Sequence, residues 1–214
     1  MKGKKVFYIA LFFSLIAILY GCNERNSRAY LEDRIGNQIS RVYPTKNLEN
    51  LFEQFPNGFT IYQSYQLSDK FIDIVLDGVE KGKPIEGTIK QINRKSGAEE
   101  KKIEVKYDSG KFSYDNEEEA RKLWPIEKFL FQEMTLNKEI LSKFKLKDTY
   151  YNRNSGGFDL EYTVKNEQIN QFLDLDNQQQ VTLGFHGSNA NRGYYYTLTV
   201  ELDRNFKFRE RIRE

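Results

Sequence analysis

Apolar and polar residues alternate along much of the chain from residue 59 onward. The apolar members of the first stretches are Phe59, Ile61, Ile72, Ile74, Leu76, Ile85, Ile89, Ile103, Val105 and Tyr107. Those of the later stretches are Phe158, Leu160, Tyr162, Val164, Val181, Leu183, Phe185, Tyr194, Tyr196, Leu198, Val200, Leu202, Phe206 and Phe208. A period of two is typical of strands with one buried and one wet face, so the sequence predicts antiparallel sheet.

Three other segments show a helical period. After Thr45, a plausible N-cap, apolar residues recur at i, i+3, i+4 and i+7 from Leu48 to Phe55. Residues 116–145 have three glutamates at positions 117–119 and two apolar stripes, and residues 166–173 form a short amphipathic stretch. Sheet and helices together predict an α+β domain over residues 43–214, and one compact unit is preferred to two.

The N-terminus has the order of a secretory signal peptide. A basic start, Met1–Lys5, precedes an apolar run over residues 6–20. A helix of that length spans about 22 Å, which is short of a usual bilayer crossing. Residues 1–21 are therefore predicted to be a signal peptide.

The run ends at Leu19-Tyr20-Gly21-Cys22, which resembles the lipobox of bacterial lipoproteins. The resemblance implies that Cys22 receives a diacylglyceryl group and that the chain is cut between Gly21 and Cys22. Two acyl chains hold a protein on a membrane where one chain does not. The resemblance therefore predicts a cell-membrane protein on the extracytoplasmic face, attached through the lipid on Cys22.

The residues that follow the cysteine are mostly polar. Residues 22–42 are predicted to be the lipidated cysteine and a polar tether, within which Ile35 and Ile39 are spaced for at most a weak helix. The tether would hold the globular part away from the lipid headgroups.

Composition excludes several classes of protein. The chain has 33 basic and 31 acidic residues, but three lysines fall within the first 21 positions, so residues 22–214 carry a formal charge of −1. This balance argues against a nucleic-acid binder. One Cys and one His exclude a disulfide framework, an iron–sulfur cluster and any multi-histidine site. No cofactor, metal site or catalytic residue is predicted, and the protein is expected to be a monomer without enzymatic activity.

The remaining candidate chemistry is a contact surface on two loops. Tyr-, Asn- and Ser-rich loops at residues 150–157 and 187–195 supply contact area at low entropy cost. His186 is expected to be a solvated residue at the start of the second loop. The candidate partner contacts are Tyr151, Arg153, Asn189, Asn191, Arg192 and Tyr195.

The segment Tyr43-Pro44-Thr45-Lys46-Asn47-Leu48-Glu49-Asn50-Leu51 resembles the start of the staphylococcal tandem-type lipoproteins. The resemblance continues through residues 59–62, 74–76, 103–106, 126–129 and 158–162, although the chain is shorter than its relatives and has Phe59 where they have Trp. The resemblance implies a divergent member of that family, a surface lipoprotein with no established enzymatic activity that is associated with host interaction.

Two functions stay open from the sequence. The first is a membrane-tethered interaction module that contacts a host or envelope protein. The alternative is an extracytoplasmic carrier, in which the curved sheet holds a small apolar or lipid ligand among the 16 Phe and 14 Tyr residues. An extracytoplasmic hydrolase would need a carboxylate pair that only a structure reveals. A solute-binding lipoprotein is disfavoured because the βαβ alternation of parallel sheets is missing.

Overall fold

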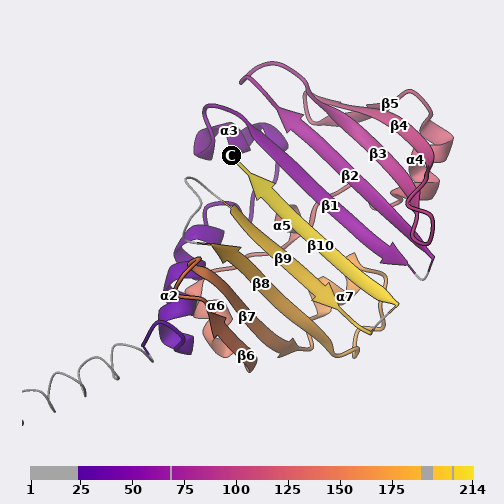
Figure 1. Ribbon diagram of the computed structural model, residues 1–214. Helices are drawn as coiled ribbons and strands as arrows, with labels where there is room; N and C mark the ends of the chain where they lie inside the picture. Colours follow the sequence, from indigo (N-terminus) through magenta and orange to yellow (C-terminus); the bar gives the residue numbers. More distant parts are fainter. Residues whose placement is uncertain (1–23, 68, 189–194, 204) are drawn as a thin grey trace, which may run out of the picture.

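The computed structural model describes residues 24–67, 69–188, 195–203 and 205–214, and its central feature is a ten-stranded antiparallel sheet (Figure 1). The strands lie in the order β5-β4-β3-β2-β1-β10-β9-β8-β7-β6. They are β1 (Phe59–Leu67), β2 (Lys70–Gly78), β3 (Ile85–Asn93), β4 (Glu99–Asp108), β5 (Lys111–Tyr114), β6 (Lys145–Tyr151), β7 (Gly157–Val164), β8 (Val181–Ser188), β9 (Tyr195–Glu201) and β10 (Phe206–Arg213). With the helices below, this confirms the predicted α+β class.

The sheet consists of two meanders that meet at its centre. Strands β1 to β5 run outward to one edge, and β6 to β10 run inward from the other. The first strand and the last therefore pair with each other, although they lie at opposite ends of the domain sequence. We call this β1–β10 pair the seam. Its register places Tyr62 opposite Arg211, Gln63 opposite Glu210 and Ser64 opposite Arg209, where Tyr62, Gln63 and Ser64 are consecutive on β1.

The helices are short. They are α2 (Arg28–Ile39), the 3-10 turn η1 (Leu48–Asn50), α3 (Leu51–Gln54), α4 (Glu117–Leu123), α5 (Leu130–Glu133), α6 (Lys138–Lys143) and α7 (Glu167–Phe172). The predicted helical region at residues 116–145 contains three of them. Asn116, Asn137 and Asn166 are N-caps, since each side chain accepts a hydrogen bond from the backbone N–H three residues later.

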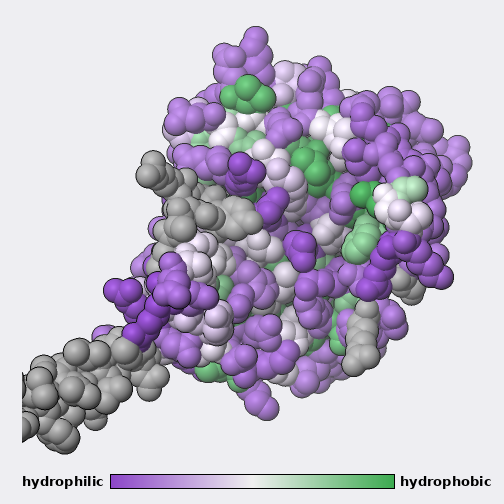
Figure 2. All heavy atoms as spheres, in the orientation of Figure 1, coloured by the Kyte–Doolittle hydropathy of each residue, from purple (hydrophilic) through white to green (hydrophobic). Residues whose placement is uncertain are grey.

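The two faces of the sheet differ in burial. In Figure 1 the helices lie behind the sheet or at its edges, and the inward-facing positions of the strands are buried against them. Ile61, Phe185 and Phe208 are each 0% exposed. Figure 2 shows the opposite face, which is mostly hydrophilic. The period of two in the sequence reports this division, because successive side chains on a strand point to opposite faces.

The predicted tether is wrong for most of its length, because residues 28–42 belong to the fold. Helix α2 buries Leu31, Ile35 and Ile39 completely or almost so within the main apolar cluster. Full burial of such a side chain contributes about 1.5–3 kcal/mol. The sequence pattern concealed this helix because its apolar stripe is only one residue wide, at i, i+4 and i+8, and most of the other residues are polar.

Polar contacts also hold α2 in place. The buried carboxylate of Glu32 accepts hydrogen bonds from Arg28 Nε at 2.7 Å and from the Tyr162 hydroxyl at 2.9 Å. The Arg28 guanidinium also donates to the carbonyls of Leu141, Ser142 and Phe144 at the end of α6. Arginine caps helix C-termini in this way because the last carbonyls lack partners within the helix. The fold therefore begins within a few residues of Cys22.

Strand β6 was not predicted from the sequence. Its pairing with β7 shifts register between Leu146 and Asp148, so the inward positions do not keep a period of two. A bulge of this kind hides a strand from pattern analysis, because two residues on one strand oppose one on its neighbour.

Candidate functional site

A buried carboxylate fixes the inner face of the seam. Glu210 is 1% exposed and accepts four hydrogen bonds. The donors are the Tyr43 hydroxyl at 2.5 Å, Gln63 Nε2 at 3.2 Å, and the backbone N–H groups of Leu130 at 2.6 Å and Phe131 at 3.0 Å. Burial raises the pKa of Glu210 to about 7, and the four donors oppose that rise. The carboxyl group therefore ties β10 to β1, to α5 and to the segment that follows α2.

The network continues through the Gln63 side chain. Its Oε1 accepts from the indole N–H of Trp124 at 3.0 Å and from the hydroxyl of Tyr65 at 3.1 Å. Burial raises the pKa of Tyr65, so this hydroxyl stays a donor at neutral pH. The polar groups on the inner side of the seam therefore have hydrogen-bond partners. These contacts hold in place the backbone from which the outer side chains project.

The outer face of the seam carries a row of basic side chains. Strand β10 presents Lys207, Arg209, Arg211 and Arg213 at alternate positions, while its other side chains point inward. Lys207 forms an ion pair with Glu201 of β9. In the described part of the chain, no carboxylate lies within 4.0 Å of the guanidinium of Arg209 or Arg213.

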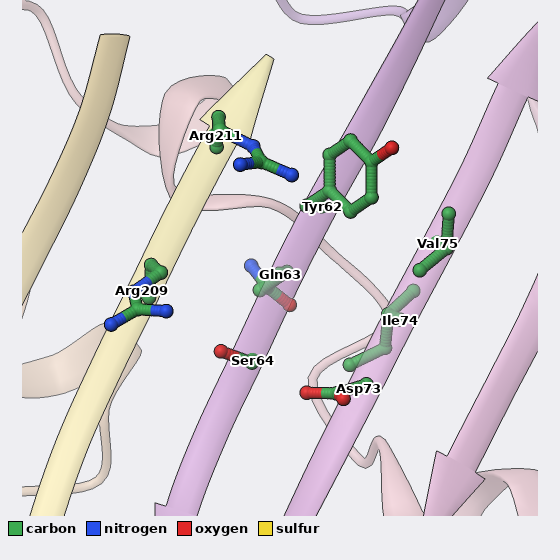
Figure 3. A pocket seen from close by; sticks show the side chains of 8 residues that line it. All are labelled: Tyr62, Gln63, Ser64, Asp73, Ile74, Val75, Arg209 and Arg211. Carbon is green, nitrogen blue, oxygen red and sulfur yellow. The ribbon is translucent and has the colours of Figure 1, made fainter. Parts of the chain in front are cut away.

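Beside this row the surface is hollowed across β10, β1 and β2. The hollow has a volume of about 280 Å³. The register explains it, because the small side chain of Ser64 lies between Arg209 on one side and Asp73 on the other. Figure 3 shows the residues that line it: Tyr62, Gln63, Ser64, Asp73, Ile74, Val75, Arg209 and Arg211.

One end of the hollow is formed by a stacked pair. The guanidinium carbon of Arg211 lies 4.1 Å from the centroid of the Tyr62 ring. Stacking of this kind holds a guanidinium by its face, while its N–H groups lie in its own plane and point away from the ring. The pair therefore presents a fixed set of donors beside an apolar ring.

The other end pairs a cation with a carboxylate across Ser64. Partial burial raises the pKa of Asp73, and the charges of Arg209 and Lys90 oppose that rise. Arg209 supplies donors only, whereas Asp73 supplies acceptors when ionised. The hollow thus offers donors along β10, acceptors on β2 and an aromatic ring on β1.

A second polar cluster lies beside the seam on the same outer face. His186 Nδ1 is 2.5 Å from Asp159 Oδ1, and its Nε2 is 3.0 Å from Thr199 Oγ1. A carboxylate oxygen accepts, which assigns the donor role in this contact to Nδ1, while the role of Nε2 towards the threonine hydroxyl depends on the tautomer of the ring. Gly184 makes this possible, since a Cβ there would lie 2.6 Å from Thr199 Oγ1. The expectation that His186 is a solvated loop residue is wrong, because it belongs to β8 and is held on both nitrogens.

The order carboxylate, imidazole, hydroxyl is that of a nucleophile with its base. Thr199 is only 3% exposed, however, which leaves its hydroxyl little access to a substrate carbonyl. We therefore assign the cluster to fixing the surface beside Arg209, which lies opposite Thr199 in the register of β9 and β10.

The predicted contact residues do not gather at this hollow. Tyr151 ends β6 and contacts the ring of Tyr30 on α2 edge-on at 6.2 Å, and Arg153 lies in the next turn. Strands β7, β8 and β9 separate both from the seam. The other predicted positions lie outside the described residues: Asn189, Asn191, Arg192, the Tyr195 side chain, and the predicted cleavage and lipidation positions Gly21 and Cys22.

Sequence reasoning missed Arg209, Arg211 and Tyr62. The signal was available on one strand, where residues 207–213 alternate basic residues with inward-facing ones. The rest of the site depends on pairing between β1 and β10, whose paired residues are 139 or more positions apart, and nothing in the local sequence indicates that pairing.

The described residues contain no group of three His, Cys, Asp or Glu side chains that would hold a metal ion. Within the same ranges, none of the helices combines the length and the apolar character needed to span a membrane.

Comparison with known proteins adds little to this picture. No family model matches the sequence, and no curated protein matches it. Among solved structures, the chain is similar to lipoprotein LppX of Mycobacterium tuberculosis, with 8% sequence identity and a TM-score of 0.39. That alignment covers 83% of this chain and 93% of LppX. A likeness this low assigns neither a family nor a function.

Proposed function

We propose that the protein is a lipid-anchored surface module that binds a partner through the outer face of its sheet. The observation that carries this proposal is the hollow at the seam, which lies on a polar face that the helices leave open and holds two arginines, a carboxylate and an aromatic ring. A few convergent polar groups in a concave surface are the usual form of a binding site. The staphylococcal tandem-type lipoproteins are the family we propose for it.

Anchoring through Cys22 would hold the domain close to the membrane. The backbone carbonyl of Asn26 accepts a hydrogen bond from Thr149 Oγ1 of β6 at 3.0 Å, so the chain is fixed to the sheet edge there. Asn26 is four positions after Cys22, and a chain of that length reaches at most about 14 Å. The β6 edge would then face the headgroups, and the seam would lie at the middle of the sheet, away from the anchored edge.

The carrier alternative gains no specific support from the described side chains. The aromatic residues that would have to line a cavity in a carrier pack against one another on the inner face. Examples are Phe129 with Phe131, whose ring centroids are 5.4 Å apart, and Trp124 with Phe129 at 5.2 Å. A lipid-sized mass that co-purifies with the intact protein would nevertheless favour the carrier over the binding module.

Site-directed photo-crosslinking in living cells tests the binding face. A benzophenone amino acid replaces Thr88, which faces outward on β3 beside the hollow, or Gln168, which is exposed on α7 behind the sheet. The proposal predicts a discrete crosslinked adduct from position 88 and none from position 168. Equal labelling at the two positions would contradict it.

The anchor is tested separately. Cys22→Ala should leave the precursor unprocessed or move the protein out of the membrane fraction, and a matched Ser14→Ala change in the apolar run should alter neither. An unchanged size and fractionation of the Cys22 variant would refute the anchor and leave the binding face untouched.

A further inference from the structure

We infer that the hollow at the seam binds an acidic polysaccharide whose sugars carry carboxylate groups. The inference rests on the proposed function, because it names the class of partner that the outer face takes. Three features of the hollow lead to it: the cationic row on β10, the acceptors opposite that row, and the ring between them.

The cationic row recognises the carboxylates. Arg209 and Arg211 point to the same face and lie two residues apart on one strand, which places their backbones about 6.6–6.8 Å apart. A guanidinium binds a carboxylate through two parallel N–H groups, and the stacking of Arg211 on Tyr62 fixes one of the two in advance. The row continues to Arg213 at the end of β10, so its charges repeat along a line and match a chain whose anionic groups also repeat.

The acceptors opposite the row select sugars over other anions. Asp73 lies across Ser64 from Arg209 and would repel a ligand that offers only negative charge. A sugar brings hydroxyl groups that donate to this carboxylate, while the Ser64 hydroxyl both donates and accepts. Partial burial of Asp73 makes an unmet acceptor there costly, which favours a ligand with donors.

The ring supplies apolar contact. Tyr62 and Val75 lie side by side in the register of β1 and β2 at the same end of the hollow as Arg211. Sugar rings expose C–H groups on their faces as well as hydroxyls at their edges, and an aromatic side chain gives such a face a broad contact. An acidic peptide offers carboxylates but neither the dense hydroxyls nor the C–H face of a sugar ring.

The test uses the full chain in a neutral detergent and three matched polymers. Fluorescent oligogalacturonate carries one carboxylate and free hydroxyls on each sugar, its methyl ester keeps the sugars without the charge, and polyglutamate keeps the charge without the hydroxyls. Binding is measured by fluorescence anisotropy at physiological ionic strength. We expect oligogalacturonate alone to bind well. Tighter binding of polyglutamate would overturn the inference in favour of an acidic protein segment.

Two variants of equal charge locate the site. Arg209→Ala with Arg211→Ala should weaken binding by about tenfold for each arginine, since a charge-assisted hydrogen bond contributes about 1.4 kcal/mol or more. Lys81→Ala with Lys83→Ala removes the same charge from the β2–β3 loop, outside the hollow, and should change affinity about twofold or less by long-range electrostatics alone. Equal loss in the two variants would show nonspecific attraction and overturn the inference.

Asp73→Ala gives the sharpest result, because general attraction of anions and recognition of sugar hydroxyls predict opposite changes in affinity. If the face only attracts anions, removal of a negative charge tightens binding. If Asp73 accepts sugar hydroxyls, its removal weakens binding, which is the result we expect, by roughly fivefold to tenfold. Circular dichroism confirms that each variant is folded. A crosslink at position 88 without any binding of oligogalacturonate would sink this inference and leave the binding module standing.

Discussion

The inner and outer faces of the seam are built from alternate residues of the same two strands. The charged group of the inner face is buried and hydrogen-bonded, whereas those of the outer face point towards solvent. On the inner face, Glu210 is buried and accepts hydrogen bonds from four donors in three different parts of the chain. One residue along in each direction, Arg209 and Arg211 point outward, and the first has no carboxylate in ion-pair contact among the described residues. A buried charge must be satisfied by the fold, whereas a charge that faces water can be satisfied by solvent or by a ligand.

The difference separates stability from binding. Changes on the inner face should destabilise the fold strongly, while changes on the outer face should affect stability little and alter mainly what the protein binds. Four measurements test that division, beginning with the one of largest expected effect.

Glu210→Ala should destabilise the protein by about 4 kcal/mol, because it leaves several buried donors without an acceptor. Arg209→Ala, on the preceding residue of the same strand, should change the free energy of unfolding by less than about 0.5 kcal/mol. Urea denaturation of the two variants measures both values. Similar losses in the free energy of unfolding of the two variants would contradict the assignment of stability to the inner face and binding to the outer face.

The pH dependence of stability should carry the signature of the same carboxyl group. Its pKa is about 7 in the folded protein against an ordinary value of 4.5, so the folded state binds more protons than the unfolded state between those values. The contribution to stability is therefore fully present below pH 4.5 and declines as pH rises towards and through 7. The total decline attributable to Glu210 is about 3 kcal/mol, from the size of the shift.

Glu210→Gln provides the control for that measurement, since the amide keeps the shape and does not titrate. The difference between the stabilities of wild type and variant should change steeply from pH 4.5 to 7 and be flat outside that window. A constant difference across the window would show that Glu210 keeps an ordinary pKa in the fold.

A matched pair of tyrosines compares the faces at the level of single hydroxyls. Tyr43→Phe removes a donor to Glu210 and should destabilise the protein by about 1.5 kcal/mol, in the range for hydrogen bonds to charged groups. Tyr62→Phe removes a hydroxyl on the outer face and should change the stability by less than about 0.5 kcal/mol. Thermal melts followed by circular dichroism separate the two, and a larger loss for Tyr62 would reverse the assignment of the faces.

The sequence predicted the alternation that creates these faces but not the partners across the seam. Period-two patterning fixes which side chains share a face within a strand, and this is why the class of the fold and most strands were predicted correctly. It contains no information on which strands pair, so the sequence could not predict that Gln63 lies opposite Glu210 or that Ser64 lies opposite Arg209. The acidic residue among the basic ones on β10 reads as an exposed strand charge until the pairing is known.

Helix α2 shows a second limit. Its stability comes from three apolar contacts and from the Glu32 network, both of which are tertiary and add little to a local pattern. Short helices depend on such packing more than on propensity. The segment was therefore predicted to be a tether, although it covers part of the core.

Arg211→Ala should have a smaller effect on stability than Glu210→Ala or Tyr43→Phe, and a clear effect on the shape of the hollow. Its stacking on Tyr62 is partly exposed, and contacts of that kind contribute about 0.5–1 kcal/mol. Arg213→Ala removes the same charge from the same strand, where no ring contact is formed within the described residues, and should change stability by less than about 0.3 kcal/mol. Urea denaturation of both variants and of the double variant with Tyr62→Phe isolates the stacking, because phenylalanine keeps the ring. If the loss for Arg211 stays the same with phenylalanine at position 62, the guanidinium acts on the ring face, as the geometry indicates; if it disappears, the hydroxyl was the partner.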